Sequence, residues 1–130
     1  MRFSRAGAFA LVASVLVSTP LRAAEVRRYD AAAFAAAQRA GRPILIDVKA
    51  WWCPVCASQN STIKRVIASP AYNNLLVLEV NYDTQKADWR GFGVQKQATL
   101  IAFRSGHEIQ RLQFVTDHDQ ITALLGRLAG

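Results

Sequence analysis

The pattern of apolar and polar residues in the first half of the chain predicts helices and strands that follow closely on one another. An Ala-rich segment that starts at Asp30, a typical N-cap residue, predicts a helix to about Ala40. The run from Ile44 to Lys49 is apolar and β-branched, so it predicts a buried strand even though it contains Asp47. A second helix is expected from Pro54 to about Ala68.

The second half continues this alternation and ends in a hairpin and a helix. We predict a strand over 75–82, a short helix over 84–90, and two antiparallel strands over 99–104 and 108–114. The last helix carries apolar residues at the i, i+3, i+4, i+7 spacing, namely Ile121, Leu124, Leu125 and Leu128. This order of elements predicts an α/β fold, in which a mixed β-sheet with a C-terminal antiparallel hairpin has helices on both faces.

The first 24 residues have the features of a secretory signal peptide. Basic Arg2 and Arg5 precede an apolar stretch over 6–17, and the small residues Ala23 and Ala24 offer a cleavage site. The apolar stretch is too short and too interrupted to favour a transmembrane span, and a retained membrane anchor is the alternative. We therefore expect a bacterial protein that is exported to the periplasm, with a single domain over residues 25–130.

The net charge changes with the loss of this segment. The whole chain has 16 basic and 9 acidic residues, for a formal charge of +7. Loss of residues 1–24 removes Arg2, Arg5 and Arg22 and leaves 13 basic residues against the 9 acidic ones. The remaining basic residues are scattered along the chain rather than gathered into a stripe, which argues against binding of nucleic acid. We expect no nucleic-acid partner.

Both cysteines fall in one motif, Trp52-Cys53-Pro54-Val55-Cys56, at the start of the second predicted helix. The dipole and the free amides at a helix N-terminus stabilise a thiolate, so Cys53 is the expected nucleophile. Cys56 lies one turn further along and is expected to form a disulfide with Cys53. A periplasmic location lets such a disulfide persist.

Three other uses of the cysteine pair stay open from the residues alone. A zinc site needs four ligands, and only His107 and His118 are left to join the cysteines, at no familiar spacing. A purely structural disulfide would close so short a loop that it constrains the unfolded chain little. Copper handling by the thiol pair is the third alternative. The motif favours disulfide exchange, and we expect no bound metal or cofactor.

The segment from Ile44 to Cys56 reads Ile-Leu-Ile-Asp-Val-Lys-Ala-Trp-Trp-Cys-Pro-Val-Cys and resembles the strand, acidic residue and Ala-x-Trp-Cys-x-x-Cys signature of thioredoxins. Residues 78–83 resemble the central strand of that family, and residues 92–103 resemble the segment that carries its substrate-facing loop. The resemblance implies a thioredoxin-like fold. It also implies that Cys53 is the attacking thiolate, Cys56 the resolving thiol, and Asp47 the buried acid that assists proton transfer at Cys56.

The physical chemistry of a buried carboxyl agrees with the role that the resemblance implies for Asp47. An Asp in an apolar strand is desolvated, which raises its pKa and makes it a usable base near neutral pH. The alternative is a carboxylate paired with Lys49, which lies two residues further along and therefore faces the same side of the strand. The family usually has an aromatic residue where this chain has Lys49.

Two further positions bear on substrate binding. Trp52 matches the aromatic residue beside the nucleophile, whereas Trp51 has no counterpart and is either an exposed recognition surface or packed against a neighbouring loop. Ala98 stands where most family members have a cis-proline, and a cis bond costs much more before alanine, so we expect a trans bond and a reshaped loop. The backbone of Gln97, Ala98 and Thr99 is expected to offer strand-like hydrogen bonds to a bound peptide.

The direction of electron flow depends on how far the Cys53 thiolate is stabilised. The motif holds no His, Lys or Arg between the cysteines, which favours a protein that reduces disulfides. The motif and its surroundings are similar to small exported thioredoxin-like proteins that take electrons from a membrane thiol reductant of the DsbD type. We therefore expect disulfide-containing periplasmic proteins as substrates. The alternatives are a disulfide-forming oxidant and a partner-binding module with a structural disulfide.

Overall fold

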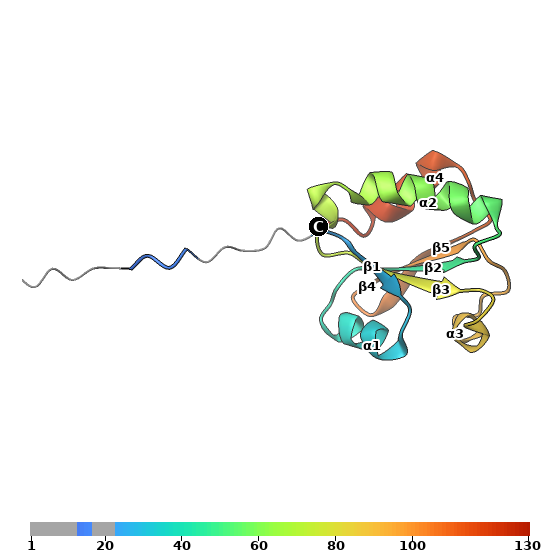
Figure 1. The fold of residues 1–130 in the computed structure, drawn as a ribbon, viewed down its shortest axis with the longest axis horizontal. Coiled ribbons are helices and arrows are strands. Elements are labelled where there is room, and N and C mark those ends of the chain that lie inside the picture. Colours follow the sequence, from blue (N-terminus) through green and yellow to red (C-terminus); the bar gives the residue numbers. More distant parts are fainter. Residues whose placement is uncertain (1–12, 17–22) are drawn as a thin grey trace, which may run out of the picture.

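A five-stranded mixed sheet forms the centre of the molecule (Figure 1). The computed structural model describes residues 13–16 and 23–130, so the predicted signal peptide, 1–24, lies mostly outside the described residues. The strands are β1 (Glu25–Arg28), β2 (Ile44–Lys49), β3 (Leu76–Asn81), β4 (Thr99–Arg104) and β5 (His107–Gln113). Their order across the sheet is β1-β3-β2-β4-β5. Strand β3 is parallel to β1 and β2, whereas β4 is antiparallel to β2 and β5.

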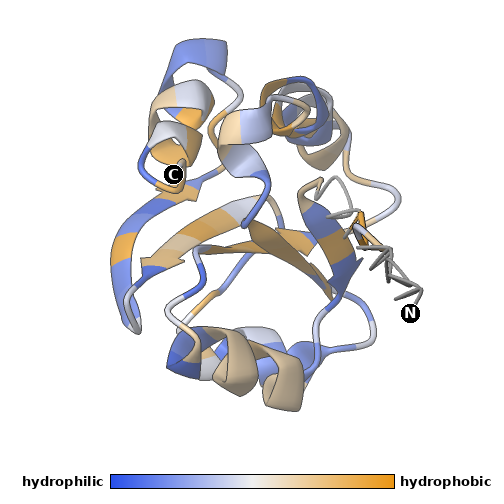
Figure 2. Cartoon of the chain, turned by 90° about the vertical axis from the view of Figure 1, so that its left-hand side faces the viewer, coloured by the Kyte–Doolittle hydropathy of each residue, from blue (hydrophilic) through white to orange (hydrophobic). Residues whose placement is uncertain are grey.

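Helices cover both faces of this sheet, as Figures 1 and 2 show. Helices α1 (Ala31–Arg39) and α3 (Lys86–Gly91) lie on one face, and α2 (Pro54–Ile67) and α4 (His118–Gly126) lie on the other, with a short 3-10 turn, η1 (Pro70–Tyr72), after α2. The predicted fold class, a thioredoxin-like α/β fold with a mixed sheet and a C-terminal hairpin, is confirmed.

Alternation along the strands divides the core into two layers. In β2, Ile44, Ile46 and Val48 pack in the layer with α1 and α3, whereas Leu45 packs in the layer with α2 and α4. The apolar positions predicted for the last helix, Ile121, Leu124, Leu125 and Leu128, are all fully buried in that second layer. Asp47 and Lys49 have the same parity as Leu45, so they face α2.

The strand β1 was not expected from the sequence. Its four residues, Glu-Val-Arg-Arg, include one apolar residue and all remain exposed, so no hydrophobic pattern marks the segment. It is a strand because it pairs with β3 at the edge of the sheet. The other elements agree with the predicted ones within a few residues. Asp30 caps α1 with its side chain, as expected, and Asp117 caps α4.

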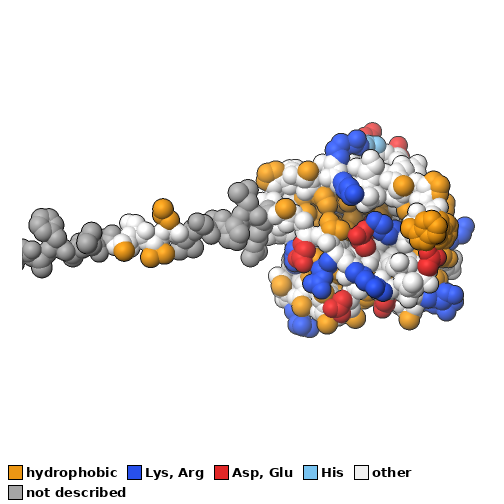
Figure 3. All heavy atoms as spheres, in the orientation of Figure 1, with side chains coloured by type: hydrophobic (Ala, Val, Ile, Leu, Met, Phe, Trp, Pro, Cys, Tyr) orange, Lys and Arg blue, Asp and Glu red, His pale blue; other side chains and the backbone are white. Residues whose placement is uncertain are grey.

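The surface carries charges of both signs. On the face drawn in Figure 3, basic and acidic side chains are interspersed, while exposed hydrophobic atoms lie over the end of the sheet where β2 passes into α2. Within the part of the chain that the structure describes, no helix has the length and apolar character needed to cross a membrane.

Candidate functional site

The two cysteines lie where β2 passes into α2. Cys53 is the N-cap residue of α2, Pro54 occupies the first turn, where no amide partner is needed, and Cys56 follows in the same turn. The Cys53 N–H donates to the Ala50 carbonyl (3.2 Å), which shapes the turn between strand and helix. Both thiols are free and nearly buried, with 4% and 3% of the residue exposed. The structure thus places the dithiol just below the surface, at the end of the sheet.

The surroundings of the two sulfur atoms differ. The Cys56 N–H donates to the Cys53 Sγ at 3.1 Å, so the helix N-terminus supports negative charge on the first sulfur. Burial raises the pKa of the Cys56 thiol well above its ordinary value, and the hydrogen bond with Cys53 and the charge of Asp47 raise that pKa further. Cys56 therefore holds its proton at neutral pH and needs a base before it can attack.

Asp47 is suited to be that base. It is 4% exposed and lines a cavity of about 140 Å³ between β2, β3 and α2, together with Asn60, Lys64 and Glu79. Burial raises the pKa of Asp47 to about 7, against an opposing effect of Lys49, and Glu79 raises that pKa slightly more. A carboxyl with this pKa exchanges protons readily near neutral pH.

Lys49 pairs with Glu79, not with Asp47 as the sequence-based alternative had it. The Lys49 Nζ donates to the Glu79 carboxylate, and Glu79 lies beside Asp47 because these two residues are in register across β2 and β3. The carboxyl group of Asp47 forms no hydrogen bond or ion pair with any residue that the structure describes. Sequence reasoning missed Glu79, since only the alignment of the parallel strands brings it to the site. The result is a buried acid flanked by one cation and one anion.

The loop before β4 lies against the dithiol. Ala98 is fully buried and packs in one cluster with Ala50, Cys53 and Cys56. The described peptide bonds include no cis bond, so the expected trans bond before Ala98 is confirmed. The residue instead adopts a left-handed backbone with φ of 59°, which is unfavourable for any residue that has a Cβ. The loop reaches the cysteines without the proline that the family usually has there.

Gln59 holds this loop in place, and sequence reasoning missed it as well. Its side chain is 1% exposed, and its Nε2 donates to the carbonyls of Ala98 and Val115, at 3.0 Å each. The carbonyl of Ala98 also accepts a hydrogen bond from Phe114, and the Ala98 N–H donates to the carbonyl of Val48 at 2.8 Å. Gln59 thus joins α2, one turn after Cys56, to two segments that lie far away in the sequence.

These hydrogen bonds reduce the number of residues whose backbone could bind a peptide as predicted. Both backbone groups of Ala98 are used within the protein, and Thr99 lies in β4, between two neighbouring strands. The backbone of Gln97 takes part in no hydrogen bond with the residues of the described part. Of the three predicted positions, Gln97 is therefore the one whose backbone is free to meet a partner.

The two neighbouring tryptophans have different surroundings. The Trp52 Nε1–H donates to the carboxylate of Asp83 (3.0 and 3.2 Å), and the ring packs edge-on against Tyr82 with centroids 6.3 Å apart. Tyr82 in turn stacks on Trp89, with ring centroids 4.9 Å apart, so the ring of Trp52 packs against a fixed aromatic pair. Trp51 has 90% of its surface exposed, which answers the choice between packing and exposure that the sequence left open.

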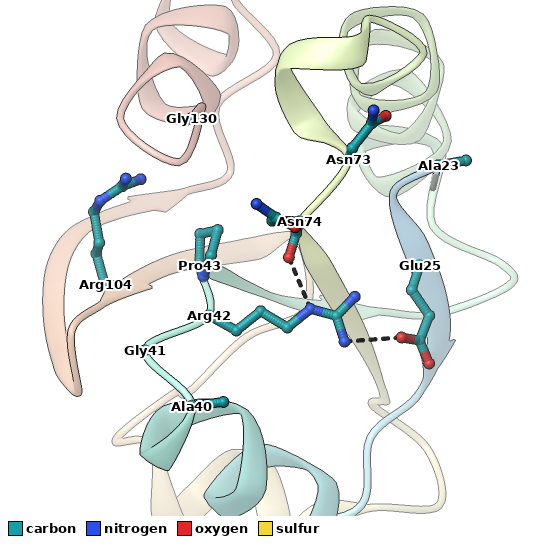
Figure 4. A pocket seen from close by; sticks show the side chains of 10 residues that line it. All are labelled: Ala23, Glu25, Ala40, Gly41, Arg42, Pro43, Asn73, Asn74, Arg104 and Gly130. Atoms are coloured by element: carbon teal, nitrogen blue, oxygen red, sulfur yellow. Dashed lines mark hydrogen bonds and ion pairs between the residues drawn. The ribbon is translucent and has the colours of Figure 1, made fainter. Parts of the chain in front are cut away.

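Other parts of the described chain offer no rival redox or metal site. No three His, Cys, Asp or Glu side chains within residues 13–16 and 23–130 lie close enough together to hold a metal ion. A cavity of about 630 Å³ lies beside Pro43, at the opposite end of β2 from the cysteines (Figure 4). Its Arg42 is already bound to Glu25 and to the carbonyl of Asn74. This cavity contains no nucleophile, and Arg42, the cation at its centre, is paired.

Comparison with known proteins agrees with this site. The family model described as Thioredoxin matches residues 25–127. Among curated proteins, the chain is 29% identical over 84 residues to the thioredoxin of Chlamydia muridarum (strain MoPn / Nigg), a match that covers 65% of this chain and 80% of the relative. It is 30% identical over 84 residues to the thioredoxin of Chlamydia caviae, with the same coverage of 65% and 80%.

Solved structures give the same result. The crystal structure of Trxlp from Edwardsiella tarda EIB202 superposes with a TM-score of 0.75 at 42% identity, covering 78% of this chain and 98% of the other. The thioredoxin of Malassezia sympodialis superposes with a TM-score of 0.68 at 19% identity, covering 82% and 90%, which supports the fold alone. With its dithiol at the start of α2, the chain belongs to the thioredoxin family and is a thiol-disulfide oxidoreductase of that family.

Proposed function

We propose that this protein reduces disulfides of proteins in the periplasm. The observation that carries the direction is the sparse stabilisation of the Cys53 sulfur. Among the described residues, the Cys56 N–H is the one backbone donor to this sulfur, its other partner is the weakly donating Cys56 thiol, and no cation lies between the two cysteines. Lys49, which lines the cavity beside both cysteines, is already paired with Glu79. A thiolate with so little stabilisation favours the disulfide form of the protein, and therefore a reductant.

The proposed reaction transfers two electrons. The Cys53 thiolate attacks one sulfur of the substrate disulfide, a mixed disulfide forms, and the other substrate sulfur leaves as a thiolate that takes a proton. The Asp47 carboxylate then removes the proton from Cys56, and the Cys56 thiolate attacks the Cys53 Sγ. The second substrate sulfur leaves as a thiolate and takes up the proton that Asp47 received, so the protein ends with a disulfide between Cys53 and Cys56 and the substrate with two thiols.

The electron donor and the location are part of the same proposal. The oxidised protein needs a dithiol reductant to start another cycle, and a membrane thiol reductant of the DsbD type fits a periplasmic protein. The basic and apolar pattern of residues 1–24 supports export. Fractionation of cells that express the whole chain is expected to recover a shortened protein in the periplasm, with an N-terminus at Ala24 or Glu25. Full-length protein in the membrane fraction would indicate a retained anchor.

A reduction potential, combined with trapping, tests the function itself. Equilibration of the purified protein with glutathione is expected to give a potential of roughly −230 to −270 mV, and the reduced protein should reduce insulin. The Cys56→Ser variant is expected to accumulate mixed disulfides through Cys53, whereas Cys53→Ser should accumulate none. A potential near −120 mV would indicate an oxidant. A Cys53 that forms no mixed disulfide would instead favour the binding module.

Lys49 and Glu79, the charged pair beside Asp47, are expected to shift the pKa of Asp47 in opposite directions when each is replaced. Because Lys49 lowers the pKa of Asp47 and Glu79 raises it, Lys49→Met should move the titration of Asp47 to higher pH and Glu79→Gln to lower pH. NMR titration of the Asp47 carboxyl carbon measures both shifts directly. The pH midpoint of the exchange rate should follow in the same directions. Shifts of the same sign in the two variants would mean that these charges do not act on Asp47 as the structure indicates.

A further inference from the structure

The side chain of Trp51 lines two open cavities next to the dithiol. One cavity, of about 190 Å³, is lined by Trp51, both cysteines and Asn60. The other, of about 290 Å³, is lined by Trp51, Arg28, Lys49 and Glu79. A segment that reaches Cys53 across the first cavity therefore has a second cavity directly beyond Trp51. The surface is continuous with the site of disulfide exchange.

The fold does not depend on aromatic or hydrogen-bond contacts of the Trp51 side chain. Trp52 is tied to Asp83 and Tyr82, whereas no aromatic pair or hydrogen bond of the described residues includes Trp51. A large apolar side chain that is left in water beside a reactive centre gains free energy when a partner covers it. Tryptophan and arginine are also the residues that most often dominate binding at protein interfaces.

The second cavity has one unpaired charge. Lys49 is paired with Glu79, but the guanidinium group of Arg28, on the edge strand β1, forms no hydrogen bond or ion pair with the residues that the structure describes. A guanidinium group binds a carboxylate through two parallel hydrogen bonds, so its natural partner is an acidic side chain. The charge of the cavity thus favours an acidic group in the incoming segment.

We propose that Trp51 and Arg28 dock the cysteine-bearing segment of a substrate protein that has a large apolar side chain next to its cystine and a carboxylate beyond it. The proposal rests on disulfide exchange by Cys53 and Cys56 and names the kind of substrate that this exchange prefers. The apolar side chain covers the Trp51 ring, and the carboxylate pairs with Arg28. The chemistry is the exchange described above, in which one protein dithiol and one substrate disulfide become one protein disulfide and two substrate thiols.

Single-turnover kinetics with matched disulfides test this proposal. The probes are disulfide-linked dimers of a short peptide with Phe next to Cys and Asp two residues further, the same peptide with Ala for Phe, and the same peptide with Lys for Asp. A small neutral disulfide, 2-hydroxyethyl disulfide, measures the chemistry of the dithiol without docking. The protein is used as the reduced mature chain, and the second-order rate of disulfide exchange is measured for each pair.

Trp51→Ala is expected to slow exchange with the Phe and Asp peptide roughly 10- to 30-fold and to leave 2-hydroxyethyl disulfide within about twofold. The loss should largely disappear with the Ala peptide, and Trp51→Phe should restore most of the rate. Arg28→Glu is expected to lower the rate of disulfide exchange with the Asp peptide and to raise the rate with the Lys peptide. Arg39→Glu, at an exposed position on α1 across the sheet, is the matched control and should change neither rate beyond the general effect of charge.

Three results would overturn the proposal in distinguishable ways. If wild-type protein fails to reduce 2-hydroxyethyl disulfide, the proposed function itself is wrong. If it reduces that disulfide and Trp51→Ala reacts like wild type with every peptide, exchange stands and the docking surface is wrong. If Trp51→Ala changes no peptide rate but abolishes co-sedimentation with anionic phosphatidylglycerol vesicles, Trp51 serves a lipid surface instead.

Discussion

Replacing Asp47 by asparagine is expected to stabilise the folded protein at neutral and alkaline pH while it slows disulfide exchange. In the unfolded chain the carboxyl loses its proton near its ordinary pKa of 3.8, whereas burial raises its pKa in the folded protein to about 7. Stability that depends on the protonated form is therefore complete below about pH 4 and is lost as the pH rises to 7. Asparagine is never ionised and escapes this loss.

The size of the effect follows from the pKa difference. At about 1.4 kcal/mol for each pKa unit, the ionised wild-type carboxyl costs on the order of 4 kcal/mol above pH 7. Urea unfolding of the reduced proteins from pH 4 to 8.5 should show Asp47→Asn close to wild type at pH 4 and more stable by up to that amount at pH 8. The exchange rate at pH 7 should fall roughly 100-fold, because Cys56 loses its base.

A matched control separates burial from a general effect of charge. Asp119 in the first turn of α4 is fully exposed, so Asp119→Asn should show no comparable rise in relative stability with pH. If the stability difference between Asp47→Asn and wild type does not change with pH, the Asp47 carboxyl is not desolvated in the folded protein. If the exchange rate stays at the wild-type value, another group takes the proton from Cys56.

Replacing Ala98 by proline is expected to destabilise this protein, although proline is the residue that most thioredoxins have at this position. The Ala98 N–H donates to the buried carbonyl of Val48, and proline removes that donor. The unpaired carbonyl alone costs roughly 1–3 kcal/mol. The φ of Ala98 is 59°, whereas proline fixes φ near −65°, so the loop must also rebuild. We expect a total loss of at least about 3 kcal/mol.

Chemical denaturation of Ala98→Pro, Ala98→Gly and wild type measures this effect. Glycine accepts the left-handed backbone and keeps the N–H, so Ala98→Gly should lie within about 1 kcal/mol of wild type. In Ala98→Pro the carbonyl that Gln59 binds should move, and the exchange rate should fall with the stability. A proline variant as stable and as fast as wild type would show that the loop adopts the usual family conformation at no cost.

Much of the fold could be predicted because its signals are local. The helix of Cys53 and Cys56, the buried strand with Asp47, and the apolar face of α4 each follow from residues that are neighbours in the sequence. The strand β1 could not be predicted, because its four exposed residues contain no hydrophobic pattern and its pairing with β3 defines it. Edge strands depend on a neighbour that the local sequence does not reveal.

The same distinction applies to the site. The sequence by itself determined the reactive pair, its position at a helix N-terminus and the buried acid, because a helix cap and a charged residue in an apolar strand are visible in a short stretch. Only the tertiary structure decided that Lys49 pairs with Glu79 and that Gln59 holds Ala98 against the dithiol. These contacts depend on strand register and on how α2 packs over the sheet, and both are set by the whole core rather than by any one segment.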